Sequence, residues 1–213
     1  YYGYVFDGVL SSADIASGLP VYPGSEAGDP KVRDVDENGI INAADRTILG
    51  NYQPDFTWGL TNNFSYKGIE LSIMLTGSQG GEIMNQQSRF LKEFNGNRNA
   101  YAYVSNFWRS DEEPGDGHIF KPRVTQNTVQ AQSSSYWVED GSFVRIKNVR
   151  LGYNFPKAWL SKLKINNLKA YLNFENVYVF SDYSNYDPEG STFQSGYRVG
   201  YDYGAYPNPF AAT

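Results

Sequence analysis

The chain has 213 residues, no cysteine and a formal net charge of -5. The absence of cysteine excludes a disulfide framework and a thiolate metal site, and the acidic balance without a basic stripe argues against nucleic-acid binding. Aromatic residues make up 16% of the chain, while the mean hydropathy is -0.53. This combination argues against disorder and is typical of a β protein whose strands are apolar on one face only. No apolar run reaches about 18 residues, which excludes a transmembrane helix but not barrel strands.

The first recognisable motif is the acidic segment DVDENGIINAAD, residues 34–45. A calcium loop of the EF-hand type supplies oxygen ligands at alternating positions and at its last position, with a central glycine for the sharp turn. Gly39 takes the turn position here. Because the last ligand is Asp, as in a dockerin half-motif, we expect a structural Ca²⁺, or Mg²⁺, held weakly at a Kd of about 10⁻⁴ to 10⁻³ M. The predicted metal ligands are Asp34, Asp36, Asn38, the Ile40 carbonyl, Asn42 and Asp45.

The same segment admits a second interpretation. Asn42 and Asp45 can form a capping box for a helix through Ile48, preceded by an acidic turn at residues 34–39. The two interpretations are compatible, because one set of oxygens can both cap and ligate. A cation would pin residues 1–55, expected to be an extracellular loop without a core of its own, since an ion that binds only the ordered state stabilises that state.

Alternating apolar and polar side chains then predict β-strands. Residues 56–76 contain two such segments around the turn Lys67-Gly68, which is the pattern of a β-hairpin with one apolar face. A long polar stretch, residues 77–136, follows, and its only helical pattern lies near residues 85–94. Loops of this length are uncommon in a compact soluble domain.

Two further strands are predicted within residues 137–180, joined by a short turn at 156–167. The parity of the apolar side chains reverses near Lys147, so we expect a bulge or a change of environment there. Residues 181–213 read as a long loop that leads to a last strand beyond the end of the chain. Long and short connections thus alternate strictly, which places all the long loops on one side of the sheet.

Strands that are apolar outside and polar inside, with long loops on one side, are typical of an outer-membrane β-barrel. The predicted strands are too few to close one, since the smallest barrels have about eight. We therefore expect an all-β fold in which this chain is a fragment of a larger transmembrane antiparallel β-barrel.

The segment WVEDGSFVRIKNVRLGYNFP resembles the C-terminal part of the SusC/RagA-like TonB-linked outer-membrane transporters of Bacteroidetes. One departure is the chain end, where AAT stands in place of a final strand that ends on an aromatic residue. Other segments resemble the family in the same order, namely YGYVFDGVLSSADI, GDPKVRDVDENGIINAADRTILGNYQPDFTWGLTNNFSYKG, LKAYLNFENVYVFSDYSNYDPEG and DYGAYPNP.

The resemblance implies a multi-pass protein of the cell outer membrane, a barrel of about twenty-two strands in contact with outer-membrane lipid and with a plug in its lumen. It implies the import of glycan oligosaccharides, or of peptides in some members, with a SusD-like surface lipoprotein as a lid. The TonB complex would supply energy through an N-terminal plug region that is absent from this chain. The short turn at 156–167 would face the periplasm, and residues 77–136 and 181–213 the outside.

Aromatic side chains of the long loops can stack on sugar rings, or can serve loop packing and the membrane interface. An enzyme is not expected, because His118 is the only histidine and the acids Asp187 and Glu189 lie in exposed, turn-like sequence rather than in a glycosidase pair. The candidates for substrate binding are Tyr101, Tyr103, Trp108, Tyr183 and Tyr186.

Two soluble classes compete with the transporter. One is a carbohydrate-binding β-sandwich with a calcium loop, and the other is a dockerin-like scaffolding module. Both predict that these residues fold alone and stay soluble without detergent. A barrel instead predicts heat-modifiable migration in detergent gels and co-purification with a lipoprotein.

Overall fold

The computed structural model describes residues 1–92, 99–123, 130, 132–190, 192 and 198–213. The chain divides into two compact units. The loop unit comprises Tyr1–Tyr52, Ile83–Glu139 and Thr192–Gly204, and the sheet unit comprises Gln53–Glu82, Asp140–Ser191 and Ala205–Thr213.

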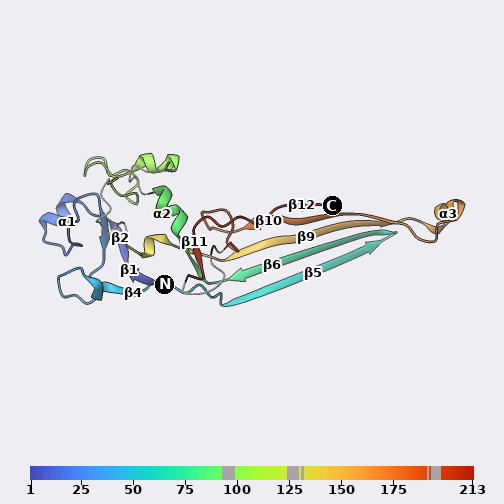
Figure 1. Cartoon of the computed structure of the whole chain (residues 1–213), viewed down its shortest axis with the longest axis horizontal. Coiled ribbons are helices and arrows are strands. Elements are labelled where there is room, and N and C mark those ends of the chain that lie inside the picture. The colour runs from blue at the N-terminus through green and yellow to red at the C-terminus, as the bar shows by residue number, and fades with distance from the viewer. Residues whose placement is uncertain (93–98, 124–129, 131, 191, 193–197) are drawn as a thin grey trace. The chain divides into compact units, whose positions relative to one another are not determined.

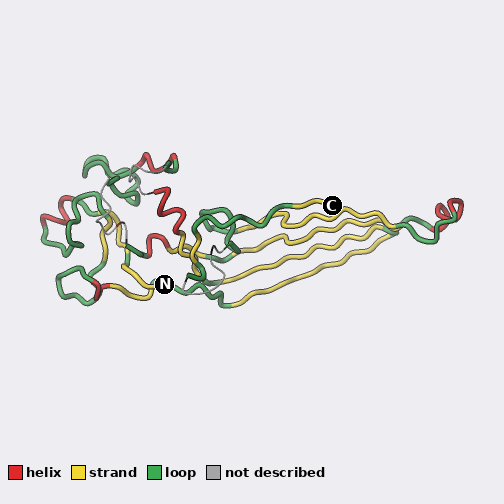
Figure 2. Tube along the Cα trace, viewed as in Figure 1, coloured by secondary structure: helices red, strands yellow, loops and turns green. Residues whose placement is uncertain are grey.

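The sheet unit is built on a five-stranded antiparallel sheet in the order β12-β10-β9-β6-β5 (Figures 1 and 2). β5 and β6 form the expected hairpin, whose turn residues Lys67 and Gly68 both have positive φ, at 47° and 87°. Such values are those of the tight turns that match the twist of paired strands. The strands are β5 (Phe56–Tyr66), β6 (Ile69–Gln79), β9 (Phe143–Asn154), β10 (Lys169–Phe180) and β12 (Ala211–Ala212).

The pairing register collects the apolar side chains of this sheet on one face. Phe64 pairs with Leu71, Leu71 with Leu151, and Leu151 with Leu172, so these four side chains form one row across the sheet. Phe64 is 58% and Leu172 56% exposed. The neighbouring row on the opposite face is polar and consists of Asn63, Ser72, Arg150 and Asn173. Because a sheet in water buries its apolar face, this uncovered band marks the wall of a barrel in lipid.

The bulge expected near Lys147 is confirmed. The pairing of β6 with β9 shifts between Met74 and Leu75, which leaves Lys147 unpaired in that ladder. The pairing of β9 with β10 shifts at the same level, between Glu175 and Tyr178. The extra residue keeps the apolar side chains of both halves of β9 on the same face, which explains the reversed parity in the sequence.

The ends of the strands differ in part from the sequence prediction. β6 continues to Gln79, three residues beyond the expected end at 76. The last strand, expected beyond the chain, begins inside it, because Ala212 pairs with Phe174 of β10. The short connection between β9 and β10 contains α3 (Lys157–Leu160) and the 3₁₀ turn η5 (Ser161–Leu163).

The loop unit consists of short elements. Its strands form two-stranded pairs, β1 with β4 and β2 with β3, and a three-stranded sheet in the order β11-β7-β8. The helical pattern near 85–94 appears as α2 (Gln86–Lys92). No helix among the described residues is long and apolar enough to cross a membrane. The other elements are β1 (Tyr2–Tyr4), β2 (Phe6–Val9), α1 (Ser12–Ala16), β3 (Pro30–Val32), η1 (Ala43–Asp45), β4 (Arg46–Ile48), β7 (Glu82–Asn85), η2 (Ala102–Asn106), η4 (Ser135–Trp137), β8 (Val138–Asp140) and β11 (Tyr201–Asp202).

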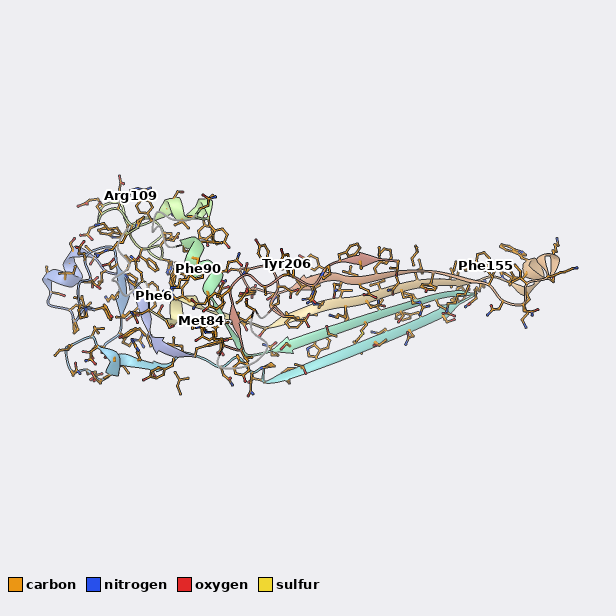
Figure 3. The ribbon with its side chains drawn as sticks, viewed as in Figure 1. Phe6, Met84, Phe90, Arg109, Phe155 and Tyr206 are labelled. Carbon is orange, nitrogen blue, oxygen red and sulfur yellow. The ribbon has the colours of Figure 1, made fainter. Side chains whose placement is uncertain are left out.

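The expectation that residues 1–55 lack a core of their own is wrong. Tyr4, Val32 and Ile41 form a buried cluster within this range. A second cluster joins distant segments, because Met84, Phe120 and Trp137 are buried together and pack against Phe6; Phe6 and Met84 are labelled in Figure 3. The sequence pattern misses these cores because each segment contributes only one or two apolar side chains.

Candidate functional site

Three carboxylates of the acidic loop converge on one point. Asp34, Asp36 and Asp45 each place an oxygen atom within 4.8 Å of the other two. Oxygens that bind one Ca²⁺ at about 2.4 Å lie at most about 4.8 Å apart, so this spacing suits a shared ion. Asp45 is fully buried, whereas Asp36 is exposed to solvent.

Backbone donors of the loop hold these carboxylates in place. The Gly39 N–H donates to Asp34 Oδ2 at 2.7 Å, and Gly39 has a φ of 81°, the left-handed conformation that glycine adopts at no steric cost. The second oxygen, Asp34 Oδ1, is buried and has no hydrogen-bond partner among the described residues. A buried carboxylate oxygen without a donor is costly unless a cation or water satisfies it. The donor set therefore fits a hard divalent cation.

Asp45 is held as a buried anion. Burial raises its pKa, but the backbone N–H groups of Asn42, Val35 and Asp36 outweigh this effect and leave the pKa below its ordinary value. The Val35 and Asn42 N–H groups donate to its two oxygens at 2.8 and 2.7 Å. The carboxylate is consequently ionised at neutral pH and available to share its remaining lone pairs with a cation.

The capping box is present, but the helix expected after it is not. Asn42 and Asp45 cap each other across the 3₁₀ turn η1, and the chain then continues as β4, in which Ile48 pairs with Tyr2. Pairing with β1 replaces the helix because it satisfies the backbone groups of a segment that contains the β-branched residues Thr47 and Ile48.

The other three predicted ligands take part in hydrogen bonds within the loop. Asn38 Oδ1 accepts from the Ile40 N–H at 2.8 Å, and the Ile40 carbonyl accepts from Asn42 Nδ2 at 3.1 Å. Asn42 Oδ1 accepts from the Ala44 N–H at 2.8 Å. An ion would bind their second lone pairs or displace these contacts, so the three Asp carboxylates are the preformed part of the site.

The five candidate aromatic residues are divided between the two units. Tyr101, Tyr103 and Trp108 belong to the loop unit, and Tyr183 and Tyr186 belong to the sheet unit. Trp108 and Tyr183 are buried, at 7% and 8% exposure, so their rings are not available to a ligand. Tyr103 and Tyr186 are more than half exposed, and Tyr101 stacks on Tyr103 with ring centroids 5.3 Å apart.

A lysine that the sequence prediction missed lies beside this stacked pair. Lys92 Nζ lies 5.9 Å from the ring centroid of Tyr103 and 5.1 Å from that of Tyr136. Burial lowers the pKa of Lys92 and raises that of Tyr103 to about 12. The ammonium group thus contacts the faces of the rings, as cations do with aromatic side chains. Lys92 is the last residue of the short helix α2. Nothing in the local sequence indicates that it contacts these rings.

Asp187 was expected in an exposed turn, and this is wrong. It is 3% exposed and pairs with Arg145 of β9, itself 2% exposed, at 2.6 Å. Glu189 lies 2.7 Å from Arg145 Nε, and the N–H of Asn208 donates to Asp187 at 2.9 Å. The cluster ties the segment after β10 to β9, so these acids are structural rather than a catalytic pair.

Comparison with known proteins gives consistent matches. No protein-family model matches the chain. The chain is 34% identical over 214 residues to TonB-dependent receptor P3 of Formosa agariphila, covering 98% of this chain and 21% of that protein. It is 25% identical over 157 residues to TonB-dependent receptor SusC of Bacteroides thetaiotaomicron, covering 71% and 14%. The chain spans about a fifth, or less, of the length of these relatives.

A solved structure supports the fold. The RagAB peptide transporter matches with a TM-score of 0.75 over 99% of this chain and 21% of the solved chain. Because the sequences are 19% identical, this match establishes the arrangement of the strands and loops only.

Proposed function

Because the chain belongs to the SusC-like TonB-dependent receptors of the outer membrane, we propose that the whole protein imports a polar nutrient, a glycan oligosaccharide or a peptide, through the lumen of its barrel. This chain contributes consecutive wall strands and the loops that follow them. The sheet with one uncovered apolar face and one polar face is the observation that carries the proposal.

The polar face of the sheet supports a hydrophilic lumen. A groove of about 570 Å³ on this face is lined by amide, hydroxyl and charged side chains, including Asn63, Ser72, Arg150 and Asn173. Polar side chains that point into a barrel suit a solute that keeps its hydrogen bonds during passage. The relatives are named as receptors and the matched solved structure as a transporter, which favours import over enzymatic conversion.

We favour an oligosaccharide, with a SusD-like surface lipoprotein as a lid and the TonB complex as the source of energy. The exposed rings of Tyr103 and Tyr186 support this choice, because flat aromatic surfaces stack on sugar rings. A peptide is the second candidate, and the matched structure described as a peptide transporter supports it.

Uptake in a deletion strain tests the proposal. The gene of the full-length protein is deleted, and growth on single oligosaccharides or on peptides as sole carbon source is compared with the parent strain. Loss of growth on one class, restored by the intact gene, is expected. Growth that is unchanged on every solute, or a protein that fractionates as soluble without detergent, contradicts the proposal.

We also propose that the loop of residues 34–45 binds one Ca²⁺ in a structural role. The convergence of Asp34, Asp36 and Asp45 and the unsatisfied Asp34 Oδ1 support this proposal. Ca²⁺ suits the loop better than Mg²⁺, because it accepts flexible oxygen coordination, whereas Mg²⁺ demands a near-ideal octahedron. The ion would hold residues 34–45 of the loop unit in place and would take no part in transport.

A further inference from the structure

The two short connections at one end of the sheet unit carry four exposed lysines, named the lysine cluster. The β5–β6 turn contains Lys67, and the β9–β10 connection contains Lys157, Lys162 and Lys164, all exposed. In the part of the chain that the structure describes, no carboxylate forms an ion pair with these four side chains. The acid nearest to the turns in sequence, Glu70, pairs with Lys169. This end of the sheet therefore presents uncompensated positive charge.

Three acidic side chains of the unit lie at the opposite end of the strands. Asp55 precedes β5, Asp140 precedes β9, and Asp182 follows β10. All three positions lie where the strands meet the long loops, away from the short turns. The charge asymmetry runs along the strand direction, which is the direction in which a barrel crosses the membrane.

An apolar hollow lies at the same end of the sheet, on its lipid-facing side. Its volume is about 350 Å³. Ala170 occupies the row of the apolar face nearest to the turn, where it pairs with Tyr153, which in turn pairs with Ile69. The small side chain of Ala170 leaves space between larger neighbours. The hollow is lined by Ile69, Leu151, Gly152, Tyr153, Ala170, Tyr171 and Leu172.

Aromatic side chains surround this end of the sheet. Trp159 of α3 is 62% and Tyr66 is 70% exposed. Phe155, labelled in Figure 3, lies where β9 leads into the α3 connection and packs against the ring of Tyr153 at 5.0 Å between centroids. Trp and Tyr at the end of an apolar band mark the level of the lipid headgroups.

We propose that the hollow and the lysine cluster bind an anionic phospholipid of the leaflet on the turn side. An acyl chain packs in the hollow beside Ala170, and the headgroup phosphate meets Lys157, Lys162 and Lys164. Each lysine near an anionic lipid surface favours binding, and a small side chain in a row of large ones gives an acyl chain a place to pack. The inference requires only the place of the strands in the membrane and not the identity of the transported solute.

Native mass spectrometry of the full-length protein in detergent tests the inference. Phosphatidylglycerol and phosphatidylcholine with the same acyl chains are added at equal concentration, and the bound lipids are compared. The wild-type protein is expected to prefer phosphatidylglycerol. The triple variant K157Q/K162Q/K164Q is expected to lose about tenfold or more of this preference, whereas K157R/K162R/K164R, which keeps the charge, retains it.

The variant Ala170→Leu separates the acyl-chain contact from the charge. The larger side chain fills the hollow without entering the protein interior, so binding of both lipids is expected to fall by a similar factor. A wild-type protein without preference for phosphatidylglycerol overturns the inference, as does a preference that survives in the glutamine variant. Unchanged lipid binding by Ala170→Leu overturns the assignment of the hollow. Heat-modifiable migration of every variant confirms that the barrel is folded.

Discussion

The loop unit and the sheet unit use the same kinds of residue in opposite ways. In the loop unit, Tyr4, Met84 and Trp137 are almost completely buried and form small cores. In the sheet unit, Phe64 and Leu172 are more than half exposed, because the solvent of that face is lipid. A high aromatic content therefore has two explanations within one chain, and only the periodicity of the residues separates them.

One charged site in each unit is neutralised in a different way. The sheet unit buries an ion pair, Arg145 with Asp187, whereas the loop unit gathers carboxylates without a basic partner in the segment of residues 34–45. Arg145 neutralises the Asp187 carboxylate within the protein. The carboxylates of residues 34–45 are instead suited to a cation from solution. Substitutions at these sites and on the two faces of the sheet can break this comparison, and the largest effect is expected at the buried ion pair.

Removal of Arg145 would leave a buried charge in the sheet unit. Arg145→Met is expected to destabilise the full-length protein by about 3–5 kcal/mol, because the Asp187 carboxylate loses its partner away from water. The double variant R145M/D187N removes both charges and should recover part of the loss. The measurement is thermal unfolding in detergent. Equal unfolding temperatures for the wild type and Arg145→Met would show that the pair contributes nothing.

A charge on the lipid-facing side of β6 tests the assignment of the faces. Ile73→Arg places a cation in the middle of the apolar band and is expected to cost about 2–4 kcal/mol. Met74→Arg, one residue along the same strand, points to the polar face and should have a much smaller effect. Heat-modifiable migration and the yield of folded protein in the outer membrane give the measurement. If Met74→Arg lowered the yield of folded protein more than Ile73→Arg, the assignment of the lipid-facing and polar faces would be wrong.

Calcium titration tests the loop unit. At a Ca²⁺ concentration about tenfold above Kd, the ion should stabilise the loop by about 1.4 kcal/mol. Calorimetry and protection from proteolysis should both detect it in the wild type. D34N/D36N should abolish both signals, whereas Glu37→Gln, an exposed acid of the same loop outside the carboxylate cluster, should retain them. Identical flat traces for all three proteins would exclude a cation site.

Acidification tests the cap of α1, the smallest of these effects. Hydrogen bonds from the Ser11 backbone and side chain and from Lys31 lower the pKa of Asp14 from 3.8 to about 2. The folded form binds the proton less readily than the unfolded form, so the contribution is complete above pH 3.8 and is lost as the pH falls toward about 2. Asp14→Asn should cost about 1 kcal/mol at neutral pH, and hydrogen exchange of α1 should then lose its acid dependence. An unchanged acid profile in the variant would remove Asp14 as the cause.

The elements that were predicted correctly depend on near neighbours in the sequence. The β5–β6 hairpin, the bulge near Lys147 and the capping box of Asn42 and Asp45 each follow from side chains within a few residues of one another. The barrel assignment follows from the alternation along each strand and from the order of long and short connections. The cation site stays a prediction, although the structure brings together three of its six ligands.

The errors all concern contacts between segments that are distant in the sequence. The helix through Ile48 is replaced by pairing with β1, some forty residues earlier. Asp187 reads as a solvated turn residue until Arg145 of β9 is placed beside it. The exposed substrate candidates and the buried Trp108 and Tyr183 have the same local sequence character, and only packing distinguishes them.

The sequence by itself determined which face of each strand meets lipid, because a period of two residues is a local property of the backbone. It also determined that the acidic loop has the spacing of a cation site. Only the tertiary structure decided that the long loops form cores of their own and that Asp187 is buried. It also placed an apolar hollow at the end of the sheet that carries the lysines of the turns. These features depend on side chains that the chain brings together from distant segments, and such contacts leave no periodic signal in the sequence.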